Sequence, residues 1–532
     1  MKKVFGFVLY LFITLGLHAQ QEKNDPYFGE SCTSIMAGKK ATTDGSVITA
    51  HTCDGNYRTW ISIESAKDHA DTSRVHILKG KLKTETQWDM REVSVAGNIP
   101  QVPHTYAFLN TAYPCLNEKQ LAIGETTFVG PDTLVNKKGM FLIEELERIA
   151  LERCSNSREA ILLIGDLIKK YGYGDWGECI TIADRDEVWQ MEILGEGPKK
   201  IGGVWAAQRI PDDHVGISAN ISRIGMIDRN DKDYFMASDN VESVAKEIGL
   251  WNGEGEFVFW KAYGHREKPF DIREFYVLNT LAPSLNLSME MPEMPFSVKP
   301  EQKVSVQTIT TLYRATYEGT PYDMTRNIKF IKKKFDANNK PAGQDTIVST
   351  IANPWPTRDE MNTINFLAPG TIDFKRTVSV AWCSYSVIIQ LRDWLPDAVG
   401  GVAWFAFDNP GESPRIPIYA GVSALPAGFD LCGQKRYNEQ SAIWSYRKAN
   451  KLATVSWGKT KDIIHENVLS FEEKALKEMP AMEKEAAKLF KNEQSADATL
   501  LITNFTRDFE SATRHRWLEL EIRFWEMFGK GF

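Results

Sequence analysis

The sequence predicts an α+β fold, in which antiparallel β-hairpins are combined with pairs of helices. Short runs of strand-forming residues begin at residue 32, and the Asp44-Gly45 pair that follows the first run is a strong hairpin signal. Apolar residues recur at helical spacing in residues 140–153 and again in residues 157–171. These observations place a hairpin-rich sheet beside a pair of helices.

The rest of the chain keeps strands and helices in separate blocks. Strand-like runs return at residues 179–182 and 188–194, and again between residues 378 and 407. Residues 463–528 have a helical pattern, with charges on one face and apolar side chains on the other. Strands and helices do not alternate one by one along the chain. We therefore expect an α+β fold instead of a doubly wound parallel sheet.

The composition fits a large folded protein and argues against two classes of chain. The 532 residues are 43% hydrophobic, which excludes a disordered chain, and the formal net charge is -7. The 63 lysines and arginines are dispersed and form no basic run suited to a phosphate backbone. We therefore expect no nucleic-acid partner.

The N-terminus has the pattern of a secretory signal peptide. Lys2 and Lys3 precede an apolar run at residues 4–17, which is short for a membrane span, and Ala19 offers a small residue for cleavage. We therefore predict that residues 1–19 are removed and that the protein is exported, periplasmic or secreted. No later run of about 18 apolar residues follows, so we expect no stable membrane association after cleavage.

The polar segment at residues 20–31 is predicted to be a leader that is removed on maturation to expose Cys32. As the first residue, Cys32 would offer a thiol and a free α-amino group, whose pKa of about 7.7–8.0 suits a base near neutral pH. The thiol could also attack the Ser31 carbonyl, form a thioester and release the leader by autocatalytic processing. The alternative role for a lone cysteine is a buried apolar residue.

Several motifs after this cysteine resemble one family in the same order along the chain. They are CTSI at residues 32–35, GKKAT at 38–42, LNEKQLAIGE at 116–125, IADRDEVWQME at 182–192, VWAAQRIPDD at 204–213, SANISRI at 218–224, YEGTPYDMT at 317–325 and LRDWLPDAVGGVAWFAFD at 391–408. Together they resemble the dipeptidase family of N-terminal-nucleophile (Ntn) cysteine hydrolases. That family is distantly similar to secernins, penicillin V acylases and bile-salt hydrolases.

The resemblance implies a four-layer αββα Ntn-hydrolase sandwich, in which two stacked antiparallel sheets lie between helices. We expect the catalytic domain over residues 32–450 and a C-terminal helical extension over residues 451–532. The implied activity is that of an exported cysteine dipeptidase that forms a thioester on Cys32. Two alternatives remain open: an amidase acting on N-acyl amino acids or conjugated bile acids, and a catalytically impaired secreted binding protein.

The resemblance also implies catalytic roles for three polar residues besides the nucleophile. Asn117, in the Leu-Asn-Glu loop, is expected to direct its amide at the oxyanion of the tetrahedral intermediate. Asn220 is expected to hold the amino end of the nucleophile or the substrate amide, and Asp54 to orient the new α-amino group. A turn is the alternative role for each of them, above all for Asp54, which precedes a Gly-Asn pair.

Three further residues are candidates for substrate binding. His51 stands where the family usually has an arginine three residues before the aspartate, and an imidazole cannot reproduce a guanidinium fork. A dipeptidase must also recognise the free amino group of its substrate, which requires a carboxylate in the cleft. The acidic YEGTPYD segment points to Glu318 or Asp323 for that contact.

No cofactor or metal is expected from the sequence. The nine histidines are dispersed without metal-ligand spacing, and the chain has no HExxH or GxSxG motif. Residues 172–177 spell GxGxxG, but the run follows a helical pattern instead of a strand, so it does not indicate a dinucleotide site. We therefore expect small peptide substrates as partners, and a homo-oligomer remains possible.

Overall fold

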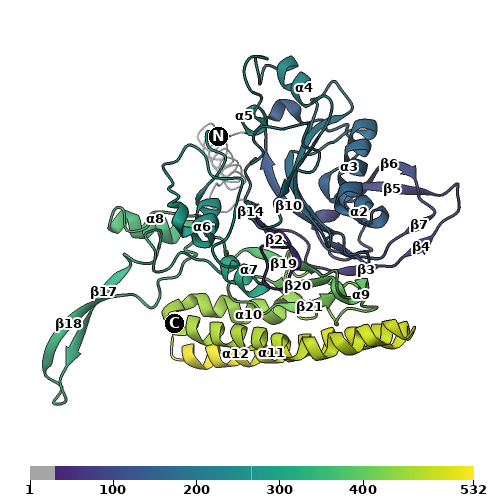
Figure 1. The fold of residues 1–532 in the computed structure, drawn as a ribbon. Helices are drawn as coiled ribbons and strands as arrows, with labels where there is room; N and C mark the ends of the chain where they lie inside the picture. Colours follow the sequence, from purple (N-terminus) through teal and green to yellow (C-terminus); the bar gives the residue numbers. More distant parts are fainter. Residues whose placement is uncertain (1–29, 265, 532) are drawn as a thin grey trace, which may run out of the picture.

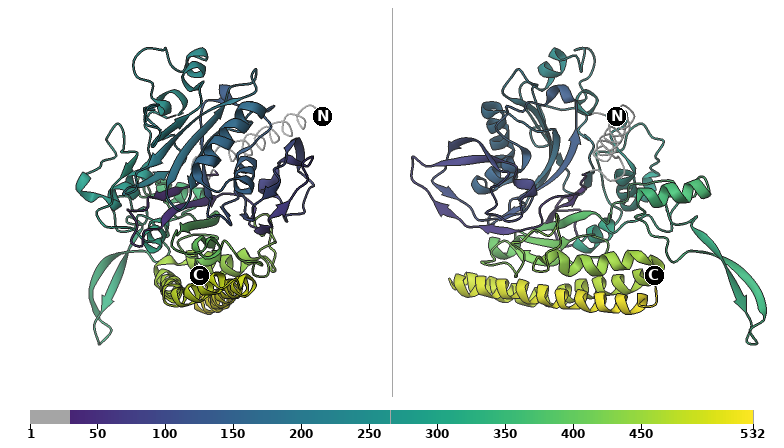
Figure 2. Two further views of the ribbon diagram at one scale, coloured as in Figure 1. Left: turned by 45° about the vertical axis from the view of Figure 1, so that its right-hand side comes forward. Right: turned by 180° about the vertical axis from the view of Figure 1, so that it is seen from behind.

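The computed structural model describes residues 30–264 and 266–531. The α+β class predicted from the sequence is confirmed, because the large sheets are antiparallel and the helices lie outside them. The two large sheets lie one above the other at the centre of the molecule (Figure 1 and Figure 2). The predicted signal peptide and most of the predicted leader lie outside the described residues.

The first sheet has seven strands, all of them paired antiparallel. Its order is β16 (Ser297–Val298), β14 (Val215–Ser218), β1 (Ser34–Ala37), β2 (Val47–Asp54), β19 (Cys383–Leu391), β20 (Val402–Phe407) and β21 (Ile416–Tyr419). The predicted hairpin at Asp44-Gly45 joins β1 and β2. Gly45 adopts a φ of +84°, and the Asp44 carboxylate accepts a hydrogen bond from Ser46 N at 3.1 Å, which closes the turn.

The second sheet has eight strands and is also antiparallel throughout. Its order is β15 (Phe235–Ala237), β13 (Gly203–Ile210), β12 (Val188–Gly195), β11 (Gly177–Ala183), β10 (Ala122–Val129), β9 (Leu116–Asn117), β8 (Phe108–Asn110) and β3 (Ser62–Glu64). Every residue of β11 and β12 is buried, as expected for strands that are covered on both faces.

The two sheets pack face to face through β2 of the first sheet, which contacts β10, β11 and β12 of the second. Polar pairs cross the interface as well as apolar ones. The hydroxyls of Thr49 and Thr181 lie 2.6 Å apart, and those of Thr126 and Ser218 lie 2.9 Å apart. Each hydroxyl therefore has a partner inside the sandwich, where an unpaired one would be costly.

Two helices cover the outer face of the second sheet. They are α2 (Ile143–Arg153) and α3 (Ser157–Tyr171), and α3 contacts β11, β12 and β13. Asn156 caps α3, because its side chain accepts a hydrogen bond from Glu159 N. The bounds of α3 agree with the helix predicted at residues 157–171.

Three helices cover the outer face of the first sheet: α10 (Ala442–Val455), α11 (Trp457–Lys491) and α12 (Ser495–Phe528). Helix α10 contacts β20, and α12 contacts β21. The buried Glu483 of α11 joins this layer to the sheet, because it accepts a hydrogen bond from Tyr419 and pairs with Arg392. The chain thus stacks in the order helices, sheet, sheet, helices (Figure 1). The domain boundary expected at residue 450 falls inside α10.

The remaining elements are short and lie around this stack. The helices are α4 (Val241–Glu247), α5 (Phe259–Tyr263), α6 (Ile272–Leu281), α7 (Val306–Tyr313), α8 (Arg358–Leu367), α9 (Asp397–Gly400) and the 3-10 turns η1 (Lys81–Lys83), η2 (Asp132–Leu134) and η3 (Pro283–Leu285). The strand pairs are β4 (Lys67–Asp68) with β7 (His104–Thr105), β5 (Arg74–Lys79) with β6 (Ser94–Pro100), and β17 (Lys329–Phe335) with β18 (Pro341–Val348).

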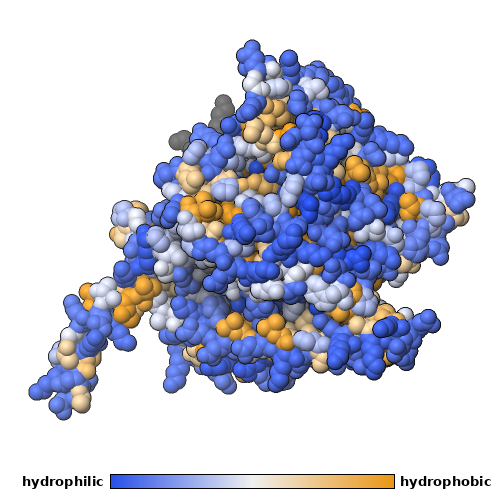
Figure 3. Space-filling view, in the orientation of Figure 1, coloured by the Kyte–Doolittle hydropathy of each residue, from blue (hydrophilic) through white to orange (hydrophobic). Residues whose placement is uncertain are grey.

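The β17–β18 hairpin projects from the body of the molecule (Figure 1). All of its β17 side chains are exposed, including the apolar Phe330, Ile331 and Phe335. In the space-filling view, apolar surface gathers near the base of this hairpin (Figure 3). The hairpin therefore exposes large apolar side chains among its lysines.

All seven cysteines lie in the described part of the chain, where they are buried free thiols. Among the described helices, none combines the length and the apolar character that a membrane crossing requires.

Candidate active site

Cys32 lies at the entrance to β1, where the chain already pairs with β2. The backbone N–H of Thr52 donates to Thr33 O at 3.0 Å, so residues near the cysteine follow the alternation of a strand. The thiol and Ser34 face β10: the thiol lies 3.4 Å from Glu125 Oε2, and the Ser34 hydroxyl donates to Glu125 O at 3.3 Å. The cysteine side chain is thus directed between the sheets and is only 1% exposed.

The backbone of Cys32 is held by two residues from distant parts of the chain. Its N–H donates to Asn220 Oδ1 at 3.0 Å, and its carbonyl accepts from Arg273 Nη1 at 2.8 Å. The same guanidinium donates to Asn220 Oδ1 at 3.1 Å. Asn220 adopts a φ of +62°, a left-handed conformation that asparagine tolerates better than most residues. Its amide then donates to Thr127 O at 2.8 Å, which fixes the side chain.

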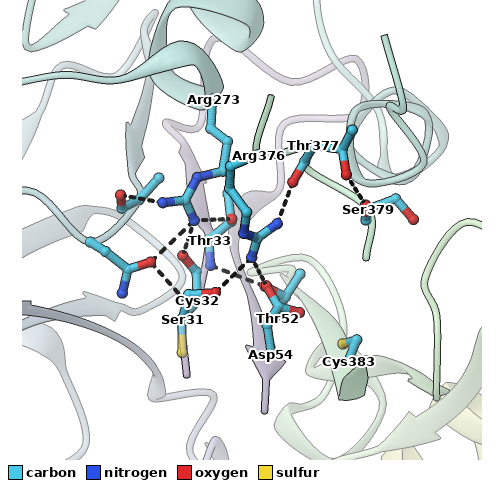
Figure 4. A network of polar contacts seen from close by, with 12 residues as sticks. Ser31, Cys32, Thr33, Thr52, Asp54, Arg273, Arg376, Thr377, Ser379 and Cys383 are labelled. Atoms are coloured by element: carbon cyan, nitrogen blue, oxygen red, sulfur yellow. Dashed lines mark hydrogen bonds and ion pairs between the residues drawn. The ribbon is translucent and has the colours of Figure 1, made fainter. Parts of the chain in front are cut away.

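The residue before Cys32 is held on the opposite face of the strand. Ser31 exchanges two backbone hydrogen bonds of 2.8 Å with Asp54, and its hydroxyl accepts from Arg376 Nη2 at 2.8 Å. Arg376 also pairs with Asp54 Oδ2 at 2.7 Å, and the Thr52 hydroxyl donates to that oxygen at 2.8 Å. Figure 4 shows the two guanidinium groups side by side, with the sulfur of Cys32 pointing away from them.

The surroundings of the Cys32 thiol favour its protonated form. Burial raises the pKa of the Cys32 thiol well above its ordinary value, and the charge of Glu125 raises it further. Burial also raises the pKa of Glu125, and it holds the pKa of neighbouring Glu178 well above the ordinary value. A thiolate therefore needs a base close to the sulfur.

His51 lies between the sheets and faces β10, on the opposite face of β2 from Asp54. It is 1% exposed, and neither ring nitrogen has a hydrogen-bond partner. Burial lowers its pKa to about 3, so the ring is neutral at physiological pH. It packs edge-on against Tyr385 at 5.8 Å between ring centroids. The cationic groups at the site are instead the guanidiniums of Arg273 and Arg376.

Asn117 lies in β9, and the structure does not bring it together with Cys32. Its amide nitrogen donates to Leu151 O and Cys154 O, both at 2.9 Å. Its carbonyl oxygen accepts from Lys119 N and Leu121 N. Both amide hydrogens are therefore used at the C-terminal end of α2, which corrects the expectation that they are directed at an oxyanion on the cysteine.

The two acidic candidates for substrate binding are also engaged away from the thiol. Asp323 accepts hydrogen bonds from Gly319 N and from Thr325 N, so it closes the turn of its own motif. Glu318 accepts from Trp457 Nε1 at 3.1 Å and pairs with Lys461. The structure therefore ties Glu318 to the start of α11, and the substrate-binding role expected for Glu318 or Asp323 stays a prediction.

Three residues at the site were missed by sequence reasoning: Glu125, Arg273 and Arg376. Glu125 closes one of the family-like motifs, and the available signal was a carboxylate at the end of an apolar strand run. Arg273 follows the N-cap Asp271 of α6, and no local pattern marks it or Arg376 as a partner of Cys32. In the described part of the chain, no group of His, Cys, Asp and Glu residues could hold a metal ion.

Comparison with known proteins places this sequence in a family. The model of peptidase family C69 matches residues 31–469. The chain is 25% identical to a probable dipeptidase of Latilactobacillus sakei, over 91% of this chain and 92% of the relative. It is 26% identical to a probable dipeptidase of Salmonella dublin over 75% and 83%, and 22% identical to dipeptidase A of Lactobacillus helveticus over 87% and 89%. The predicted resemblance to a dipeptidase family is confirmed, and the protein is a peptidase that belongs to family C69.

Proposed function

We propose that the protein is a dipeptidase in which Cys32 is the nucleophile and the α-amino group of the same residue is the base. The relatives named as dipeptidases support the substrate class. One contact carries the mechanism: Cys32 N donates to Asn220 Oδ1 at 3.0 Å, beside the thiol of the same residue. Asn220 is thus in place to hold the nitrogen that becomes an amine when the preceding bond is cut.

Maturation breaks the peptide bond between Ser31 and Cys32, and hydrogen bonds fix the residue on each side of this bond. Asp54 N donates to Ser31 O at 2.8 Å, so this carbonyl is polarised and its oxygen has a donor for a developing negative charge. The Cys32 sulfur attacks the Ser31 carbonyl carbon, the C–N bond breaks, and the nitrogen takes the thiol proton. Water then cleaves the thioester, which releases the leader as a carboxylic acid and restores the thiol.

Hydrolysis of a dipeptide uses the same atoms in a second cycle. The neutral α-amine takes the thiol proton, and the sulfur attacks the substrate carbonyl carbon to give a thioester. The scissile nitrogen leaves with a proton from the α-ammonium. The amine then removes a proton from water, which attacks the thioester and frees the first amino acid.

Export and the identity of the fold complete the proposal. The basic and apolar N-terminal pattern supports a signal peptide, and the family match begins only at residue 31, the last residue of the predicted leader. The order of helices, sheet, sheet and helices supports an Ntn-hydrolase sandwich, with residues 32–450 as the catalytic domain and residues 451–532 supplying most of one outer layer.

The mass of the purified active protein tests the mechanism. We expect the mature chain to begin at Cys32, Cys32→Ala to lose hydrolysis and keep the leader, and Cys32→Ser to process slowly because a hydroxyl is the weaker nucleophile. Cys432→Ala removes a different buried thiol and is the matched control. Full activity in a form that still carries residues 20–31 contradicts the α-amino base.

A further inference from the structure

Two buried glutamates lie on neighbouring strands of the second sheet, and one of them contacts the thiol. Glu125 is on β10 and Glu178 is on the neighbouring β11, where Glu178 pairs with Thr127. Since Glu125 is two residues from Thr127, both carboxylates lie on one face of the second sheet. Glu125 is 0% exposed and Glu178 is 3% exposed, so the pair is shielded from solvent.

Among the described residues, the hydrogen-bond donors to Glu125 are uncharged groups. Glu125 accepts from the Cys32 thiol at 3.4 Å and from the Thr127 hydroxyl at 3.0 Å. Glu178 lies beside Glu125 on the neighbouring strand, and within the described part of the chain its Oε2 is buried without a hydrogen-bond partner. In the described residues, neither carboxylate forms an ion pair with a lysine, arginine or histidine. Buried carboxylates are usually paired, so a cation brought to this pair by a substrate would be bound favourably.

The position of Glu125 matches the position of one group on a peptide substrate. In the attacked residue, the α-nitrogen is two bonds from the carbonyl carbon, about 2.5 Å away. The sulfur must approach that carbon to about 3–3.5 Å before attack. The α-nitrogen of a bound peptide therefore lies within a few ångströms of the sulfur, and Glu125 Oε2 lies 3.4 Å from the same sulfur. When the α-nitrogen of the peptide lies on the Glu125 side of the sulfur, the carboxylate is within hydrogen-bond reach of the α-ammonium.

We propose that the Glu125–Glu178 pair binds the free α-ammonium group of the substrate and so restricts hydrolysis to peptides with an unblocked N-terminus. The inference rests on the proposed dipeptidase function and assigns the contact that the sequence placed at Glu318 or Asp323. Burial holds the pKa of Glu178 well above its ordinary value, so Glu178 is the member of the pair that keeps its proton and Glu125, next to the thiol, carries the charge.

This arrangement also couples substrate binding to the nucleophile. An empty Glu125 opposes thiolate formation, because its negative charge lies next to the sulfur. A substrate ammonium neutralises that charge, so a thiolate forms more readily when a peptide with a free N-terminus is bound. A peptide with a blocked N-terminus brings no cation, so the charge of Glu125 continues to oppose thiolate formation.

The test compares a dipeptide with its desamino analogue, such as Ala-Ala with N-propionyl-alanine, on the full matured protein. Turnover is measured as kcat/KM where it is detected, and otherwise as a competitive inhibition constant. In Glu125→Gln we expect kcat/KM for the dipeptide to fall by about 10²-fold or more, whereas that for the analogue should not fall and should rise where thiolate formation limits turnover, because the opposing charge is gone. Glu178→Gln keeps an uncharged side chain of the same size beside Glu125, so it should keep the preference with a loss of about tenfold or less.

Glu147→Gln is the matched control, because Glu147 of α2 is also fully buried with both carboxylate oxygens unpartnered, yet it does not contact Cys32. It should stay within about threefold of the parent on both substrates. An equal loss on both substrates in Glu125→Gln, or an unchanged preference, overturns the inference. A parent that matures at Cys32 by mass and hydrolyses no peptide overturns the proposed function instead.

Discussion

Arg376 Nη2 lies 2.7 Å from Asp54 Oδ2, and the same nitrogen donates to Ser31 Oγ at 2.8 Å. Asp54 is fully buried and the Arg376 side chain is 12% exposed, so water screens the pair little. In the proposed maturation this pair holds the leader side of the bond that is cut. Arg273 and Asn220 hold the other side, at the carbonyl and the nitrogen of Cys32.

Replacing Arg376 by glutamine should slow maturation and destabilise the protein. Asp54 would lose its counter-charge, and breaking a buried ion pair costs about 3–5 kcal/mol. Pulse-chase labelling with intact-mass readout should show leader removal slowed by about tenfold or more, because Ser31 loses its hydroxyl contact. Arg436→Gln, which removes an exposed arginine paired with Glu85, is the control. Leader removal at the parental rate in Arg376→Gln would show that the pair is only structural.

Asn220 should affect chemistry through its side chain rather than its backbone. Asn220→Ala removes the amide and also strains the left-handed φ, whereas Asn220→Gly removes the amide and tolerates that φ. We expect both variants to mature and hydrolyse dipeptides about 10²-fold more slowly, measured as kcat, and only the alanine variant to lose additional thermal stability. Near-parental kcat in Asn220→Gly would assign the residue to the turn alone.

Asn117→Ala should change stability more than catalysis. Its amide satisfies two carbonyls at the end of α2, and leaving buried acceptors without donors costs about 1–3 kcal/mol. Chemical denaturation should therefore show a lower free energy of unfolding, with kcat per folded enzyme close to the parent. A drop in kcat of about 10²–10³-fold at unchanged KM would instead restore the oxyanion role expected from the sequence.

The parts of the fold that the sequence predicted are those fixed by local chemistry. The Asp44-Gly45 turn predicts the β1–β2 hairpin, because a positive φ and a short side-chain acceptor act within a few residues. Helix α3 agrees with its predicted bounds because its apolar spacing and its cap are local. The stacking of β2 on β10 leaves no such pattern, since each strand is buried on both faces.

The same distinction explains the site. Cys32 could be proposed as the nucleophile because its position after a predicted leader is itself a sequence feature. Its partners Glu125, Arg273 and Asn220 are separated from it by 93, 241 and 188 residues, so only the stacking of the two sheets brings them together. Asn117 lies within the right motif, but the direction of its side chain depends on the end of α2.

His51 should make the folded protein sensitive to acid. Burial lowers its pKa to about 3 in the native state, from about 6.5 when it is unfolded. Below pH 6.5 the His51 imidazole of the unfolded chain therefore binds a proton, whereas that of the native chain does not. Stability from this residue is complete above pH 6.5 and is lost as the pH falls toward 3. Between pH 7 and pH 5 the loss from this one group is about 2 kcal/mol.

The measurement is the free energy of unfolding of the matured protein in urea at pH 7.5 and pH 5.0. His51→Leu should lose about 2 kcal/mol less than the parent over this interval, because it has no imidazole to protonate. Its stability at pH 7.5 reports the packing change against Tyr385 separately. His515→Leu, at a side chain that is 77% exposed, should keep the acid dependence of the parent. An acid loss in His51→Leu equal to that of the parent would assign the effect to other buried groups, since leucine cannot titrate.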